Sequence, residues 1–79
     1  MGAYIDNREI SITINNLPPG FYAFGYAYSI TDAPSEVIET DHGCMVIACK
    51  MGSSEMFVYI DSNISGAWKK LKNRAWVSL

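Results

Sequence analysis

The chain has 79 residues, enough for one small domain, and its formal net charge is −2 at pH 7. Apolar residues make up 49% of it and charged residues 18%, so it lacks the basic excess expected of a nucleic-acid-binding protein. A domain this short buries little more than half of its unfolded surface, about 60% for 60 residues. Part of its apolar surface is therefore expected to face another chain.

The two cysteines, Cys44 and Cys49, lie five positions apart in an apolar run and would point to opposite faces of a strand. We expect two buried, reduced thiols that behave as small hydrophobic side chains and neither pair nor share a metal. No run approaches the ~18 apolar residues of a membrane span, and the N-terminal residues do not predict a signal peptide. The pattern is typical of a protein made in a reducing compartment.

The N-terminal half predicts an arm followed by two strands. Residues 1–9 are mixed and polar and are expected to form a loosely tied arm, with a single β domain over 10–79. Ile10–Ile14 alternates strictly, which predicts a half-buried strand whose isoleucines face a core. Leu17-Pro18-Pro19-Gly20 then predicts a sharp turn, because proline fixes φ and glycine tolerates positive φ.

An aromatic strand is predicted after this turn. Its alternation places four rings on one face, those of Tyr22, Phe24, Tyr26 and Tyr28. The other face carries small residues, which suggests close approach by another element. The stripe of rings has three interpretations: a core, a seam between subunits, or a platform on which a sugar ring stacks. The last follows from tyrosine's apolar face and polar hydroxyl.

The middle of the chain predicts a loop and a hairpin. Residues 30–35 are expected to form a loop, and 35–40 either a short helical turn or an extended stretch. His42, the only histidine, is expected in an exposed turn. Cys44–Lys50 predicts a strand buried on both faces or nearly so. A hairpin loop then leads to a returning strand at Met56–Ile60.

The last segment allows two predictions. Apolar residues at helical spacing predict a C-terminal amphipathic helix over 62–76. Alternatively, two short strands at 68–71 and 76–79 are joined by a turn at 72–74, and Gly66 and Asn73 argue against a helix. We favour a mainly β fold, a small antiparallel sheet of about five short strands with at most one short helix. The basic cluster within 69–74 is expected to be a solvated face.

No catalytic set is recognisable in the sequence. It contains no Cys–His pair at a familiar spacing, no phosphate-binding glycine loop and no zinc-ligand cluster. The acidic residues are scattered and are expected to be solvated surface charge. They are Asp6, Glu9, Asp32, Glu36, Glu39, Asp41, Glu55 and Asp61. We therefore predict a non-enzymatic protein without a metal or a cofactor.

The order of features resembles the pyocin-knob family, small modules of phage tail fibres and phage-derived bacteriocin fibres. The matching pieces, over residues 10–71, are the turn and Gly-Phe-Tyr start at Asn15–Tyr22, the loop Thr31–Pro34, the strands Gly43–Ile47 and Met56–Ile60, and the closing Trp68-Lys69-Lys70-Leu71. Two positions depart from the family pattern. Ser65 stands where a first tryptophan is usual, and Asp61 stands about where an arginine is usual, so no pairing through a forked guanidinium is expected.

The resemblance implies a structural domain of a phage or prophage tail fibre or baseplate that acts in fibre assembly or host-surface attachment. It implies a homotrimer in the virion tail, made in the bacterial cytoplasm, with a host surface polysaccharide as a partner. Two alternatives stay open: a monomeric glycan-binding module, and a small intracellular regulator or inhibitor that docks its C-terminal helix on a protein. The candidate ligand-binding residues are Tyr26, Tyr28, Trp68, Lys70 and Trp76.

Overall fold

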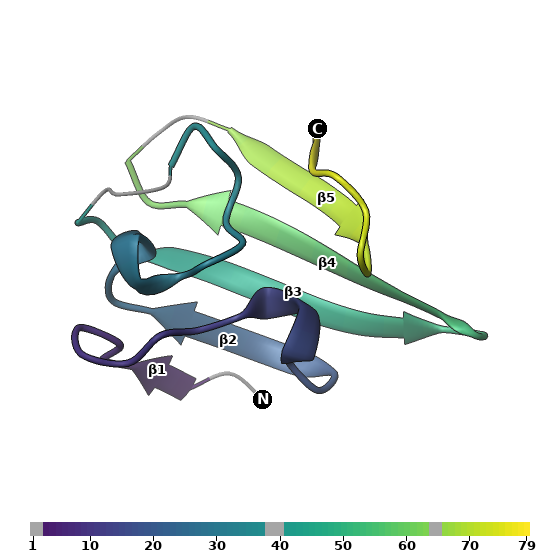
Figure 1. The fold of residues 1–79 in the computed structure, drawn as a ribbon, viewed down its shortest axis with the longest axis horizontal. Helices are drawn as coiled ribbons and strands as arrows, with labels where there is room; N and C mark the ends of the chain where they lie inside the picture. The colour runs from purple at the N-terminus through teal and green to yellow at the C-terminus, as the bar shows by residue number, and fades with distance from the viewer. Residues whose placement is uncertain (1–2, 38–40, 64–65) are drawn as a thin grey trace.

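The computed structural model describes residues 3–37, 41–63 and 66–79, and six strands form one sheet in chain order (Figure 1). The strands are β1 (Ala3–Ile5), β2 (Gly20–Phe24), β3 (Cys44–Met51), β4 (Ser54–Asp61), β5 (Ala67–Leu71) and β6 (Val77–Ser78). The predicted mainly β fold is confirmed. The sheet is mixed, however, because β1 pairs with β2 in parallel while all the other pairs are antiparallel.

The β3–β4 hairpin is the longest pairing in the sheet, and it confirms the predicted hairpin. It pairs the strands from Cys44 opposite Asp61 to Met51 opposite Ser54. Its two-residue loop begins at Gly52, whose φ of 61° lies in the left-handed region that glycine adopts without strain. The other strands flank this hairpin on both sides.

The C-terminal residues form two short strands, so the alternative helix over 62–76 is wrong in the part that the structure describes. Asn73 has a φ of 63° in the turn between β5 and β6, and the Arg74 N–H donates to the Leu71 carbonyl at 3.0 Å. On β5, Trp68 and Lys70 are buried while Lys69 is exposed, which is the period of a strand. Pairing with β4 therefore outweighs the helical spacing of the apolar residues.

Two loop segments, residues 6–19 and 26–37, lie on one face of the sheet and cross in front of it in Figure 1. They include the 3₁₀ turns η1 (Ile14–Asn16) and η2 (Ala27–Ser29). The predicted strand at Ile10–Ile14 is wrong: only an isolated bridge between Ile12 and Ile30 forms there. The chain turns at η1 because a carboxylate from the other loop accepts its N–H groups.

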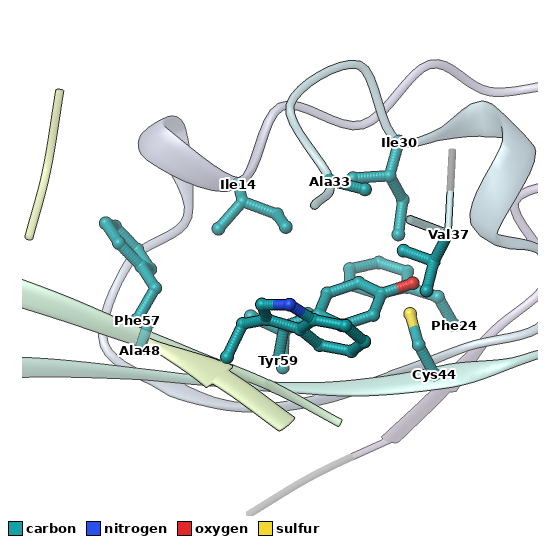
Figure 2. Close-up of a cluster of buried hydrophobic side chains, with 11 residues drawn as sticks. Ile14, Phe24, Ile30, Ala33, Val37, Cys44, Ala48, Phe57 and Tyr59 are labelled. Carbon is teal, nitrogen blue, oxygen red and sulfur yellow. The ribbon is translucent and has the colours of Figure 1, made fainter. Parts of the chain in front are cut away.

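The core lies between the sheet and these loops. It consists of Ile14, Phe24, Ile30, Ala33, Val37, Cys44, Val46, Ala48, Phe57, Tyr59 and Trp68. Figure 2 shows Ile14, Ile30, Ala33 and Val37 reaching from the loop layer toward Phe57, Tyr59 and Cys44 on the strands. All of the strand residues in this cluster point to the same face of the sheet, which we call the covered face.

The N-terminal arm is more tightly held than its composition predicted. Residues 3–5 form the edge strand β1, and Asn7 is fully buried. The Asn7 side chain accepts a hydrogen bond from the Tyr26 N–H at 2.8 Å and donates one to the Tyr26 carbonyl at 2.6 Å. This clamp bends the chain after β2, so the predicted aromatic strand ends at Phe24 and its stripe of four rings is broken.

Candidate functional site

The second face of the sheet, which we call the open face, is lined almost entirely by apolar side chains. Strand register defines it: Ala23 lies opposite Met45, Met45 opposite Ile60, and Ile60 opposite Ala67. Its members are Tyr4, Phe21, Ala23, Met45, Ile47, Cys49, Met51, Ser54, Met56, Val58, Ile60, Ala67, Lys69, Leu71 and Val77. No residue of the described core cluster belongs to it.

Most large apolar side chains of the open face are strongly exposed. Tyr4, Phe21, Met45, Met51, Ile60, Leu71 and Val77 are between 36% and 67% exposed, whereas Ile47, Met56 and Val58 at the centre of the face are partly buried. Among the strand residues that the structure describes, Lys69 carries the only charge on the face. An antiparallel sheet with one solvated face normally alternates apolar and polar residues, so that the outer face is polar. A contiguous exposed apolar patch marks an interaction surface. The open face is therefore the candidate functional site.

The strand sequences explain why this face is apolar. In Cys44–Ala48 every residue is apolar, and we predicted a strand buried on both faces. That prediction is wrong for the described chain: Val46 is fully buried, while Met45 next to it is 40% exposed. The loop segments cover one face only, which leaves the other with the composition of a core and the exposure of a surface.

Three of the predicted ligand-binding residues, Trp68, Lys70 and Trp76, lie together on the covered face. Tyr59 contacts both tryptophan rings edge to face, with ring centroids 5.9 Å apart in each case. The Lys70 ammonium lies 5.3 Å from the centre of the Trp76 ring. Trp68 and Lys70 are both buried, so only Trp76 of these three presents part of its surface to solvent.

Lys70 is the buried cation of this cluster, and the prediction of a solvated basic face is wrong for it. Its ammonium donates to the Asn15 side-chain oxygen at 2.7 Å and lies 3.8 Å from the Asp32 carboxylate. Burial lowers the pKa of the Lys70 ammonium, and the negative charge of Asp32 partly opposes this effect. The lysine thus joins β5 to both loop segments.

Asp32 is a central residue that the sequence analysis missed. Its two carboxylate oxygens accept the N–H groups of Ile14 at 2.7 Å and Asn15 at 3.0 Å, and its carbonyl accepts the Trp76 indole N–H at 2.7 Å. The prediction that it is one of the scattered, solvated surface charges is wrong. One feature of the sequence could have pointed to Asp32: it lies between the β-branched pair Ile30-Thr31 and Ala33-Pro34, in a loop that must cross the sheet.

The other two predicted residues, Tyr26 and Tyr28, lie elsewhere, so the five candidates do not form one site. Their rings contact each other with centroids 5.4 Å apart, and the Arg8 guanidinium lies 5.2 Å from the centre of the Tyr26 ring. Arg8 also donates to the Asp6 carboxylate at 2.9 Å, which raises its pKa. Tyr28 is exposed, beyond the end of β2.

A buried polar cluster closes the end of the β3–β4 pair. The His42 Nδ1 lies 2.8 Å from the Asp61 carboxylate, whose side chain is fully buried, so the prediction of an exposed turn histidine is wrong. The Cys44 thiol and the Tyr59 hydroxyl interact beside them. Burial raises the pKa of the Cys44 thiol to about 11, and burial also raises the pKa of Tyr59.

The Cys44 thiol predicts a loss of stability in alkali. Its folded-state pKa of about 11 exceeds the unfolded value, so its contribution is fully present below about pH 8.5 and is lost as pH rises toward 11. Lys70 changes the stability in the opposite direction as pH rises, because folding lowers the pKa of its ammonium. Relative to the Cys44→Ala variant, the unfolding free energy of wild type should fall by about 2–3 kcal/mol between pH 9 and 11.

Urea unfolding at a series of pH values measures this difference. The matched control is Cys49→Ala, which removes the exposed thiol on the open face. Parallel pH curves for wild type and Cys44→Ala would contradict the account of Cys44.

Within residues 3–37, 41–63 and 66–79, no three metal-binding side chains are grouped as a metal site, and no helix is long and apolar enough to cross a membrane. Cys44 and Cys49 lie on opposite faces of the sheet, as predicted, but Cys49 is exposed, so the prediction of a buried thiol is wrong for it. Comparison of the chain with family models, with curated proteins and with solved structures finds no match.

Proposed function

We propose that this chain is a non-enzymatic assembly module of a phage or prophage tail fibre or baseplate, which acts by burying its open face against sister chains. The open face carries the proposal. Its apolar composition is that of an interface core, in which charged residues are depleted. Burial of exposed apolar surface is favourable by about 25 cal/mol per Å², so a surface of this kind gains strongly from association.

The resemblance to pyocin-knob modules supplies the setting of this proposal. It implies a place in the virion tail and three copies around a fibre axis. The open face itself supports only the part of the proposal in which sister chains cover it. A regulator that docks a C-terminal helix receives no support, because Ala67–Leu71 and Val77–Ser78 are strands.

Substitution at the centre of the open face tests the proposal. Ile47 and Val58 lie opposite each other in the middle of the β3–β4 pair. The Ile47→Glu variant should fold, because the position lies on the open face, outside the core, and is partly exposed in the single chain, but it should place a charge in the proposed interface. We expect light scattering to give an oligomer for wild type and the single-chain mass of 8.8 kDa for the variant.

The control is Asn16→Glu, which adds the same charge at an exposed position of η1, on the covered side. It should leave the mass unchanged, and circular dichroism should show that both variants fold. A wild-type chain that remains at 8.8 kDa at every concentration would contradict self-association.

A second candidate function, glycan binding, is favoured by a shallow groove on the covered side. Trp76 is half-buried there, and polar groups of Ser35, Glu36 and Ser78 line the same groove. An indole face beside hydroxyl and carboxylate groups suits a sugar ring, which has an apolar face and a hydroxyl rim. Host surface polysaccharide added to wild type should shift the tryptophan fluorescence, and Trp76→Ala should abolish the shift. An unchanged spectrum at saturating polysaccharide would rule this function out.

A further inference from the structure

We infer that the shallow groove beside Trp76, which we call the Trp76 groove, selects a ligand that carries an ammonium group. Among glycans it therefore binds an amino sugar with a free amine more tightly than a neutral or an acidic sugar. The inference rests on the second candidate function, glycan binding, and deepens it by assigning the charge of the sugar. It is independent of self-association through the open face, because the groove lies on the covered side of the sheet.

Two parts of the chain form the Trp76 groove. Ser35 and Glu36 line it from a loop of the covering layer, and Trp68, Trp76 and Ser78 line it from the C-terminal strands and the turn between them. Its volume of about 410 Å³ falls within the range of roughly 300–1,000 Å³ that small-molecule sites occupy. Trp68 is buried and Trp76 is half-buried, so a ligand meets mainly the indole of Trp76.

Contacts with the core hold the Trp76 ring in place. Its indole N–H donates to the Asp32 carbonyl at 2.7 Å, and the Tyr59 ring lies 5.9 Å away, edge to face. Because the indole N–H already has an acceptor, the exposed part of the ring offers a ligand its π surface rather than a hydrogen-bond donor. The face of an indole carries negative partial charge and attracts a cation more strongly than the other aromatic side chains do.

The formal charge that lines the groove is negative. Among the described residues that line it, only Glu36 is ionisable, and it is exposed. Its carboxylate accepts a hydrogen bond from the Ser35 hydroxyl at 3.5 Å. The Lys70 ammonium near the Trp76 ring is buried, does not line the groove, and lies 3.8 Å from the Asp32 carboxylate that opposes its charge. A ligand therefore meets a carboxylate and an indole face, which favour an ammonium group and disfavour a carboxylate.

A pair of oligosaccharides that differ only in the amine tests the inference. A glucosamine tetramer carries free amines, and the N-acetylglucosamine tetramer of the same linkage has the same rings without the charge. At about pH 6, where such amines are protonated, each is titrated into wild type and followed by tryptophan fluorescence. Because both the ring and the carboxylate are partly solvated, we expect the glucosamine tetramer to bind about tenfold more tightly.

Three variants separate the groove from general attraction between a cationic sugar and a chain of net charge −2. Glu36→Gln keeps the size of the side chain and removes its charge, so it should weaken binding of the glucosamine tetramer alone and bring the two affinities together. Glu9→Gln is the matched control, because it removes the same charge at an exposed position that does not line the groove. It should retain the preference. Trp76→Ala should abolish the fluorescence shift with both tetramers.

A preference for the glucosamine tetramer that Glu36→Gln removes and Glu9→Gln retains supports the inference. Equal affinities of wild type for the two tetramers, or a preference that persists in Glu36→Gln, would overturn it while leaving glycan binding intact. A preference lost equally in Glu9→Gln would also overturn it, because the charge of the whole chain would then be responsible. No response to either tetramer would overturn the inference, and the titration with host polysaccharide described above then decides glycan binding by itself.

Discussion

Replacing Asp32 with alanine is expected to lower the free energy of unfolding by about 3–5 kcal/mol, because it leaves the buried Lys70 ammonium without the neighbouring Asp32 carboxylate. The Ile14 and Asn15 N–H groups lose their acceptor at the same time. The total free energy of unfolding expected for a chain of this length is about 4–12 kcal/mol. The variant should therefore be largely unfolded by mild urea, as followed by tryptophan fluorescence at a fixed protein concentration.

Two companion variants separate charge from geometry. Lys70→Met removes the buried charge but keeps an unbranched stem, and its cost should stay within about 1.5 kcal/mol. Combined with Asp32→Ala, it should recover part of the loss, because no ammonium is then left unpaired. Glu36→Ala, an exposed carboxylate in the same loop, should change stability by no more than about 0.5 kcal/mol. A cost below about 1 kcal/mol for Asp32→Ala would mean that its carboxylate does not hold the loop layer to the sheet.

Replacing Tyr59 with alanine should cost about 3–5 kcal/mol of unfolding free energy, the range for removing a large buried ring. The side chain is fully buried and makes edge-to-face contacts with Trp68 and Trp76 at 5.9 Å. Its loss would leave a cavity between the sheet and the C-terminal turn. Urea unfolding measures the cost, and the near-ultraviolet circular dichroism of the tryptophans should collapse with it.

The controls for Tyr59 vary the ring and the hydroxyl separately. Tyr59→Phe keeps the ring and removes only the hydroxyl that interacts with Cys44, so its cost should be about 1 kcal/mol. Tyr28→Ala removes an exposed tyrosine outside the core and should cost no more than about 0.5 kcal/mol. Equal costs for Tyr59→Ala and Tyr28→Ala would contradict the core described above.

Local pattern was sufficient to predict the centre of the sheet. In β3 and β4, apolar runs flank a loop with glycine at a position that needs positive φ, and both strands and their hairpin were predicted. The choice between strands and a helix at the C-terminus was open, because spacing at three to four residues and alternation coexist in the same segment. Pairing of β5 with β4 decided it.

The loop layer could not be predicted because distant contacts determine it. Ile10–Ile14 alternates like a strand, but the Asp32 carboxylate accepts the N–H of Ile14 and the chain turns there. The aromatic run after Phe24 is bent by the Asn7 clamp on Tyr26. Neither contact has a sequence signature, since the partners are 18 and 19 residues apart.

The sequence was sufficient to predict an apolar surface, but not which residues form it. Low charge and excess apolar residues predicted a surface for another chain, and four of the five named ligand residues were chosen for their rings, the fifth being Lys70. The structure places these rings in the core, at the Trp76 groove and near Arg8, while the open face consists mainly of aliphatic and methionine side chains. It arises because both alternating positions of β3 and β4 are apolar and only one side receives a covering layer.

The most direct test of self-association through the open face is an isotope-filtered nuclear Overhauser experiment on a mixture of labelled and unlabelled chains. The account predicts contacts between the methyl groups of Ile47 and Val58 of one chain and those of Met45, Met56 and Ile60 of another, and their loss in Ile47→Glu. Contacts between chains that come only from residues outside the open face, or none in an oligomer, would contradict it.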